Sequence, residues 1–202
     1  MPKESPLPTA NAIVQLQTEA VQRWHQQDID NRHTGLMHLV CQQHASNFRL
    51  WHQEDQARSP TASDTQIASV KRSIDALNQQ RNDQIELIDD AITNMLASVV
   101  DATGAKQNTE TPGSAIDRLS IMSLRLFHYR EQADRAGIND NLRQSVADRI
   151  NVCQRQQSDL SQSLQELLDD LIAGRKRHRV YRQMKMYNDP LLNPAIYDAD
   201  EN

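Results

Sequence analysis

The sequence predicts an all-α fold, a single-domain bundle of about five helices with one very long central helix. Aromatic residues make up only 4% of the 202 residues, and there are five glycines and seven prolines. Long uninterrupted stretches are rich in Gln, Asn, Asp and Arg, and apolar residues recur along them at steps of three and four. That spacing is the period of an amphipathic helix, so a helical bundle is favoured over a sheet.

The predicted domain covers residues 9–187, which is enough chain for one hydrophobic core. Residues 1–8 contain three prolines and are expected to form a disordered lead. Residues 188–202 are expected to form a turn-rich acidic tail. The polar composition implies thin cores and exposed helix faces, which is compatible with a homo-oligomer.

The first two helices are predicted from their caps and breaks. Thr9 or Asn11 can cap a helix that ends near Asp30. A second helix is expected over residues 34–58, because the Ser-Pro-Thr-Ala-Ser segment that follows it is a break. The apolar face of the first helix consists of Ile13, Leu16, Ala20 and Trp24.

The third helix is the long central one. Ser63 or Asp64 can cap its start, and its apolar pattern continues to about Asp101. Roughly 38 residues at a rise of 1.5 Å give a length of about 57 Å, so partner helices must cover it. Its apolar seam consists of Ile67, Val70, Ile74, Leu77, Ile85, Ile88, Ile92, Met95 and Val99.

Two more helices follow a polar loop at residues 102–111. Ser114 and Asp117 have the capping-box spacing and are expected to start the fourth helix, which Gly137 ends. The fifth helix is expected over residues 139–174, where a glycine provides the stop signal.

Arg81 interrupts the apolar seam of the third helix. It occupies the position that should continue the seam between Leu77 and Ile85. A buried guanidinium is costly unless it is paired or binds an anion, so this stretch is the best candidate for a site. The alternative is a structural ion pair with an acid on a neighbouring helix, such as Asp159 or Asp117.

A polar stripe runs beside this seam. Such a stripe is usually a solvated helix face. The functional alternative is a wall of donors and acceptors in a polar cleft, where Asn78, Gln79 and Asn82 would bind the hydroxyl groups of a ligand. The stripe consists of Lys71, Asp75, Asn78, Asn82, Glu86 and Asp89.

The second helix places polar side chains around Trp51, among them Asn47, which is a further ligand-binding candidate. A histidine in such surroundings is more often a hydrogen-bonding core residue than a catalytic one. No zinc-protease spacing and no E-x-x-H pair is present, so no metal and no cofactor is expected. If the protein is an enzyme, its acid-base candidates are His44, His52, Glu54 and Asp55.

Two further segments could attract anions. Residues 112–114 with Arg118 resemble an anion site at a helix start, although capping and a surface cation explain the same residues. Residues 175–185 hold six Lys or Arg and no acid, among them Arg182 and Lys185. Residues 1–174 hold 16 Lys or Arg against 23 Asp or Glu, and this acidic body argues against nucleic acid as a partner.

The location is expected to be cytoplasmic. Cys41 and Cys153 lie in apolar helical patterns without disulfide or zinc spacing, which favours a reducing compartment. The first residues lack the apolar core of a signal peptide, and no run approaches the roughly twenty apolar residues of a membrane span. No glycine-rich phosphate loop is present.

Four segments in order carry a resemblance to a family: HLVCQQHASNFRLWHQEDQAR, KRSIDALNQQRNDQIELID, TPGSAIDRLSIMSLRLFHYRE and YRQMKMYNDPLLNP. They resemble the bacterial domain-of-unknown-function family four-two-five-four, and the likeness covers roughly residues 34–194. It implies a cytoplasmic all-helical protein and carries over no activity, cofactor or catalytic residue. It also implies a setting near glycosyltransferases of cell-surface polysaccharide assembly.

Two functions are therefore considered. The first is binding of an anionic, phosphorylated sugar-like metabolite, with Arg81, Arg118, Arg182 and Lys185 holding the anion. The second is a non-catalytic adaptor or scaffold for a glycosyltransferase or similar partner, in which the same polar residues form networks that fix helix register. The two differ in whether the polar groups converge on an empty pocket or on internal carboxylates.

Overall fold

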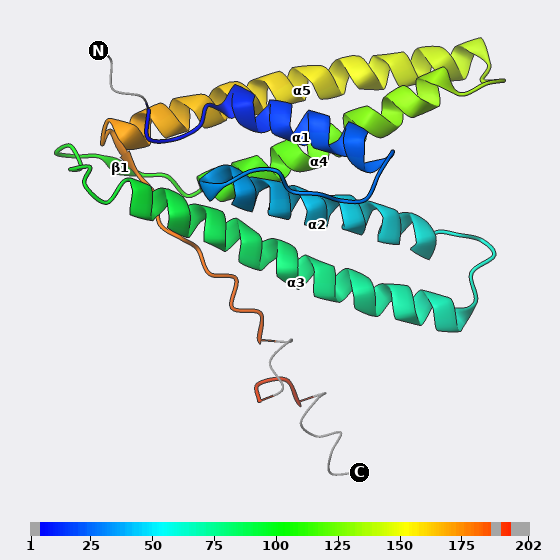
Figure 1. Cartoon of the computed structure of the whole chain (residues 1–202), viewed down its shortest axis with the longest axis horizontal. Helices are drawn as coiled ribbons and strands as arrows, with labels where there is room; N and C mark the ends of the chain where they lie inside the picture. The colour runs from blue at the N-terminus through cyan, green and yellow to red at the C-terminus, as the bar shows by residue number, and fades with distance from the viewer. Residues whose placement is uncertain (1–4, 187–190, 195–202) are drawn as a thin grey trace.

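A computed structural model describes residues 5–186 and 191–194 of the chain, and it confirms the all-α prediction (Figure 1). The described part contains five α-helices and one pair of two-residue strands. The elements are α1 (Ala10–Trp24), α2 (Gly35–Ala57), α3 (Asp64–Met95), β1 (Lys106–Gln107), α4 (Pro112–Asp134), α5 (Asp140–Ile172) and β2 (Lys176–Arg177).

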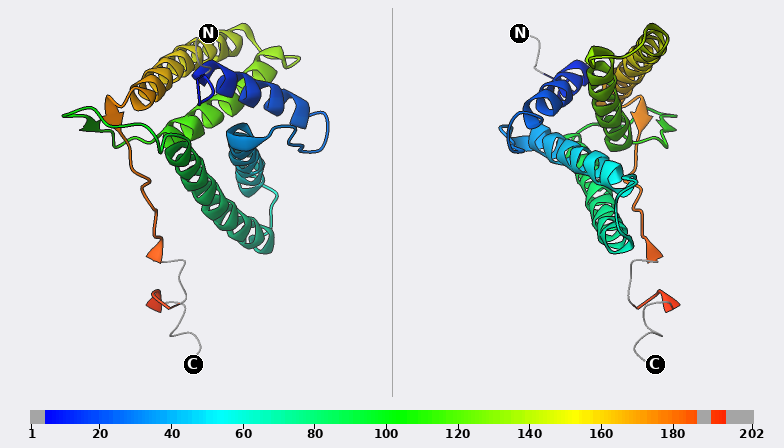
Figure 2. Two further views of the ribbon diagram at one scale, coloured as in Figure 1. Left: turned by 60° about the vertical axis from the view of Figure 1, so that its left-hand side comes forward. Right: turned by 90° about the vertical axis from the view of Figure 1, so that its right-hand side faces the viewer.

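The helices form two antiparallel hairpins. α2 packs mainly on α3, and α4 packs mainly on α5. The hairpins lie close together at one end and diverge toward the other (Figure 1). α1 packs on α4 and also contacts α2 and α5, so it joins the two hairpins (Figure 2).

Two helices are shorter than the sequence predicts. α3 has 32 residues, or roughly 48 Å, and ends at Met95 because its buried seam stops at Ile92. α1 ends at Trp24 and not near Asp30. The Trp24 indole N–H donates to the Asp30 backbone oxygen at 3.2 Å and to its carboxylate at 3.1 Å, so the chain folds back there.

The start of α4 also differs from the prediction. The expected capping box of Ser114 and Asp117 is wrong, because the helix begins one turn earlier. Thr111 is the N-cap, its hydroxyl accepts the Ser114 backbone N–H at 3.2 Å, and Pro112 follows at the first helical position. Asp117 is thereby released from capping and lies in the interior.

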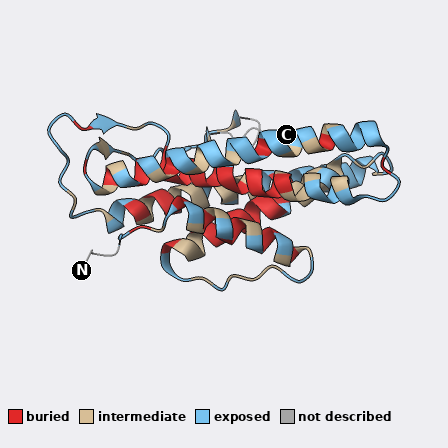
Figure 3. Ribbon diagram, turned by 90° about the horizontal axis from the view of Figure 1, so that it is seen from above, coloured by how far each residue is buried: buried red, intermediate tan, exposed pale blue. Residues whose placement is uncertain are grey.

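The core runs through the middle of the bundle (Figure 3). Ile13, Ile88, Ile116 and Leu164 are examples of its fully buried side chains, and they come from four different helices. Around the turn between α4 and α5, residues are mostly exposed (Figure 3). Most of the apolar free energy is therefore gained where the two hairpins and α1 meet.

The segment after α5 crosses α3 (Figure 1). β2 pairs in parallel with β1, with Lys106 opposite Lys176. Arg182 then reaches α3, where its guanidinium contacts Glu86 at 3.1 Å and Asp90 at 2.8 Å. The basic segment is thus tied to acidic residues of the same chain.

Parts of the predicted lead and tail lie outside the described residues, namely residues 1–4, 187–190 and 195–202. In the described part of the lead, Leu7 is buried against the core. Among the described residues, no helix combines the length and the apolar character needed to cross a bilayer.

Candidate functional site

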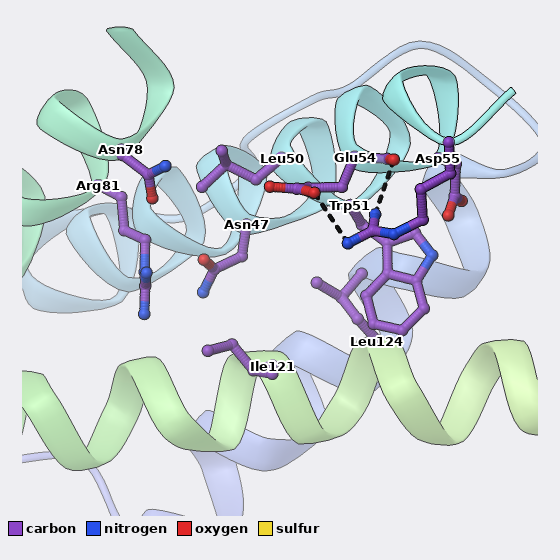
Figure 4. A pocket seen from close by; sticks show the side chains of 10 residues that line it. Asn47, Leu50, Trp51, Glu54, Asp55, Asn78, Arg81, Ile121 and Leu124 are labelled. Carbon is purple, nitrogen blue, oxygen red and sulfur yellow. Dashed lines mark hydrogen bonds and ion pairs between the residues drawn. The ribbon is translucent and has the colours of Figure 1, made fainter. Parts of the chain in front are cut away.

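A cleft of about 420 Å³ opens between α2, α3 and α4 (Figure 4). Its walls are mixed, with apolar side chains from α4 and from Leu50 and Trp51 of α2, and polar ones from the rest of the α2 lining and from α3. A volume of this size suits a small molecule. The lining residues are Asn47, Leu50, Trp51, Glu54, Asp55, Arg58, Asn78, Arg81, Ile121 and Leu124.

Arg81 forms a salt bridge with Asp117 across the inner end of the cleft. Its Nε donates to Oδ1 of Asp117 at 2.7 Å, and its Nη2 donates to Oδ2. The Asp117 side chain is 6% exposed and that of Arg81 is 25% exposed. Hydrogen bonding to this carboxylate raises the pKa of Arg81 above its ordinary value. The guanidinium in the seam is therefore explained by an internal partner, and Asp117 is one of the two acids named for that role.

Asp117 is also the centre of a buried polar network. The side-chain amides of Gln43 and Asn47 donate to its Oδ1 at 2.6 and 2.9 Å. Asn47 also donates to the hydroxyl of Ser120 at 2.9 Å, and His44 bonds to the same hydroxyl through Nδ1 at 2.7 Å. These contacts link α2, α3 and α4, so the network fixes how the two hairpins dock.

His44 lies behind the cleft. It is fully buried, and Trp24 stacks on its ring with centroids 5.2 Å apart. Burial lowers the pKa of His44 to about 3, and a smaller effect of the Gln17 backbone opposes the change. His44 is therefore neutral at neutral pH and does not line the cleft.

The outer part of the cleft contains Glu54, Asp55 and Arg58. Glu54 pairs with Arg58 at 2.9 Å, and Figure 4 shows Glu54 close to Trp51. Together with Arg81, the lining carries two acids and two cations. The cleft is thus polar without a strong excess of positive charge.

The other predicted ligand-binding residues lie elsewhere. Arg118 pairs with Glu110 on the surface, and Arg182 pairs with Glu86 and Asp90. Lys185 is half-buried on the C-terminal segment, Asn82 is buried in α3 outside the cleft, and Gln79 donates to Asp83 at 2.7 Å. Only Asn47, Asn78 and Arg81 of the predicted set meet in the cleft.

Residues 37–180 match a protein family described as "Protein of unknown function (DUF4254)". The chain belongs to this family. No curated protein and no solved structure matches the chain. The match contains the cleft and the Asp117 network, whereas α1 lies before it. In this DUF4254 protein, the features that connect α2, α3 and α4 are thus part of the family domain.

A second buried acid joins α3 to the start of α4 in the DUF4254 domain. The backbone N–H of Gly113 donates to Oδ1 of Asp89 at 2.7 Å, and Asp89 is 2% exposed. Burial raises the pKa of Asp89 to about 6, while hydrogen bonds from Thr111 and Gly113 oppose the rise. The helix start that the sequence indicated as an anion site therefore holds a carboxylate of the same chain.

Gly113 allows α4 to approach α3 closely. A Cβ atom at this position would lie 2.6 Å from the backbone oxygen of Ile85 and 2.9 Å from Oδ1 of Asp89. We expect Gly113→Ala to lower the free energy of unfolding by about 1–3 kcal/mol, since the backbone must shift to relieve the contact. Urea unfolding measures this loss. Gly137→Ala is not a suitable control because of its positive φ, so Ala97→Gly on the surface serves instead. An unchanged midpoint for Gly113→Ala would show that the close packing of α3 on α4 is not needed.

His52 is brought together with two residues that the sequence analysis did not consider. Its side chain lies near His25 and His128, which belong to other parts of the chain. Burial lowers the pKa of His52, and the two other histidines lower it further. No spacing along the chain links these three positions, because each comes from a different element. His25 follows the last residue of α1, His52 lies in α2 and His128 lies in α4. Within the described residues, they are the group of side chains placed to hold a metal ion.

Proposed function

We propose that this DUF4254 protein is a cytoplasmic protein whose cleft binds a sugar-like small molecule with at most one anionic group, placed beside Arg81. The observation that supports it is the cleft itself, in which Trp51 and Ile121 offer apolar surface and Asn78 offers an amide. Asn47 also lines the cleft, but its N–H groups already donate to Asp117 and Ser120. A sugar has the matching character, because its ring carbons pack on apolar surface and its hydroxyl groups need donors and acceptors.

The charge of the cleft supports one anionic group and no more. Arg81 already donates two hydrogen bonds to Asp117, and Glu54 and Asp55 lie at the other end. A ligand with several phosphates would face these acids without enough cations to offset them. A neutral or singly phosphorylated sugar avoids this repulsion.

The cysteines and the family resemblance agree with a cytoplasmic location and a sugar-like ligand. Cys41 and Cys153 are buried free thiols, as is common in reducing compartments. A sugar-like ligand also agrees with the link to cell-surface glycan assembly that the resemblance implies.

The experiment is a thermal-stability screen of the purified protein against sugars, sugar phosphates and nucleotide sugars. A ligand at about one hundred times its Kd should stabilise the protein by roughly 2.7 kcal/mol. We expect Asn78→Ala to abolish most of this stabilisation, because Asn78 lines the cleft. Gln79→Ala is the matched control, since the neighbouring Gln79 bonds to Asp83 outside the cleft. Absence of any stabilising compound, or equal effects of both variants, would refute the proposal.

A second candidate is the adaptor or scaffold for a glycosyltransferase or similar partner. The observation in its favour is the Arg81–Asp117 contact, because the buried cation has an internal carboxylate and needs no ligand. This candidate predicts no response in the screen and a co-purifying subunit in native mass spectrometry of protein from its own host. Retention of a small molecule instead would favour the cleft.

A further inference from the structure

Three histidines converge from three helices. His25 is the C-cap residue of α1, His52 lies in α2 and His128 lies in α4. One ring nitrogen from each lies within 4.8 Å of the others, and all three side chains are half-buried. They lie at the junction of α1 with the two hairpins, where the helices are fixed by packing.

Hydrogen bonds orient two of the three imidazole rings. Nδ1 of His25 lies 2.7 Å from the backbone oxygen of Val21, and Nδ1 of His128 lies 2.7 Å from the carboxylate of Glu131. A carbonyl or carboxylate oxygen only accepts, so each Nδ1 carries the hydrogen and each neutral ring presents a lone pair at Nε2. Both Nε2 atoms are buried without a hydrogen-bond partner among the described residues.

A buried lone pair without a hydrogen-bond donor is costly. The pattern of an oriented Nδ1–H and an open Nε2 is the one that metal coordination requires. A metal-binding histidine normally donates its other ring N–H to a carboxylate or a backbone carbonyl, which fixes its tautomer and orientation. His128 with Glu131 is the first case, and His25 with Val21 is the second. Two of the three rings are thus prepared for coordination.

Aromatic side chains surround the rings. Phe127 stacks on His25 with centroids 4.1 Å apart, and Trp51 stacks on His128 at 4.6 Å with an interplanar angle of 10°. Phe48 lies edge-on to His52 at 4.6 Å. These contacts limit the rotation of the three imidazole rings.

We propose that His25, His52 and His128 bind one divalent transition-metal ion of the zinc class. Zinc prefers neutral imidazole nitrogen at about 2.0–2.1 Å in tetrahedral geometry, which sets ligand nitrogens roughly 3.3 Å apart. The ring nitrogens, now within 4.8 Å of one another, need to approach by at most about 1.5 Å, within the range of small side-chain torsions. Three protein ligands leave a fourth position for water or a ligand, as in catalytic zinc sites and unlike closed structural ones.

This site goes beyond the sugar-binding proposal and does not depend on it. Trp51 lines the cleft and also stacks on His128, so the histidine cluster lies next to one wall of the cleft. No metal is expected from the sequence alone, because it contains neither a zinc-protease spacing nor an E-x-x-H pair. The fold, and not the sequence spacing, brings them together.

The experiment is titration of the untagged full chain with Co²⁺, a spectroscopic substitute for zinc, followed by competition with Zn²⁺. We expect one equivalent to bind with the intense visible absorption of tetrahedral cobalt and to raise the Tm. His52→Ala should weaken binding more than about 100-fold, as loss of one of three ligands requires. His33→Ala is the matched control, because His33 lies outside the cluster.

A second variant, Glu131→Gln, distinguishes a loss of metal binding from a loss of protein stability. Glu131 is 47% exposed, so Glu131→Gln should leave the Tm of the metal-free protein unchanged. It should weaken metal binding about 10- to 100-fold, because His128 loses its orienting carboxylate. Glu166→Gln on the exposed face of α5 serves as its control and should change nothing. Failure of the wild-type protein to bind Co²⁺, or binding that persists undiminished in folded His52→Ala, would overturn the proposal.

Discussion

Replacing Asp117 by alanine should lower the free energy of unfolding by about 3–5 kcal/mol. The substitution leaves Arg81 without its carboxylate partner and removes the acceptor of the Gln43 and Asn47 amides. Removing one partner of a buried ion pair is costly because the other charge stays in a poorly solvated place. At this chain length, the loss corresponds to a fall in Tm of roughly 10 °C. Urea unfolding followed by circular dichroism measures it.

The control is a double replacement. Arg81→Met combined with Asp117→Leu removes both charges and leaves apolar side chains of similar size. Such exchanges are often neutral or better, so the double variant should be more stable than Asp117→Ala. Asp148→Ala on the exposed part of α5 should have little effect. A loss below about 1 kcal/mol for Asp117→Ala would contradict the role given to the network, since surface pairs have that magnitude.

Asp89→Asn should change how stability depends on pH. The pKa of Asp89 is about 6 in the folded protein, and the ordinary value is 3.8. Between these values the folded state holds a proton that the unfolded state lacks, so the contribution of Asp89 to stability falls as pH rises. A difference of about two between the folded and unfolded pKa values corresponds to roughly 3 kcal/mol. Asparagine keeps an acceptor for Gly113 and cannot ionise.

The measurement is urea unfolding of both proteins from pH 4 to pH 8. The stability of Asp89→Asn relative to wild type should increase by about 3 kcal/mol over this range, with most of the change between pH 4 and 6. Asp83→Asn on the exposed face of α3 is the control and should follow wild type. A constant difference between Asp89→Asn and wild type would show that Asp89 titrates at its ordinary pKa.

The fold was accessible from the sequence because its determinants are local. Helix caps at Thr9, Ser63 and Asn139 and the period of apolar residues define α1, α3 and α5 without knowledge of tertiary contacts. The ends of α1 and α3 were predicted several residues too far. At those points tertiary contacts, such as that of Trp24 with Asp30, decide where the helix stops.

The candidate site could be predicted from the sequence only in part. Arg81 stands out because it breaks an apolar seam, and Asp117 was one of two acids named as its partner. The choice between them required the docking of α4 on α3, which no local pattern encodes. The same limit applies to His25 and His128, which look like ordinary helix residues until α1 and α4 are packed together.

The two-hairpin architecture has a consequence for the order of folding. Each hairpin joins helices that are neighbours in sequence through a short turn, at residues 58–63 and 135–139, so the loop-closure entropy of forming either one is small. The Arg81–Asp117 contact joins one hairpin to the other and can form only when the two dock. We therefore expect it to be absent from the folding transition state, so that its removal accelerates unfolding and leaves the folding rate nearly unchanged. The polar network would then act mainly as a kinetic barrier against separation of the hairpins.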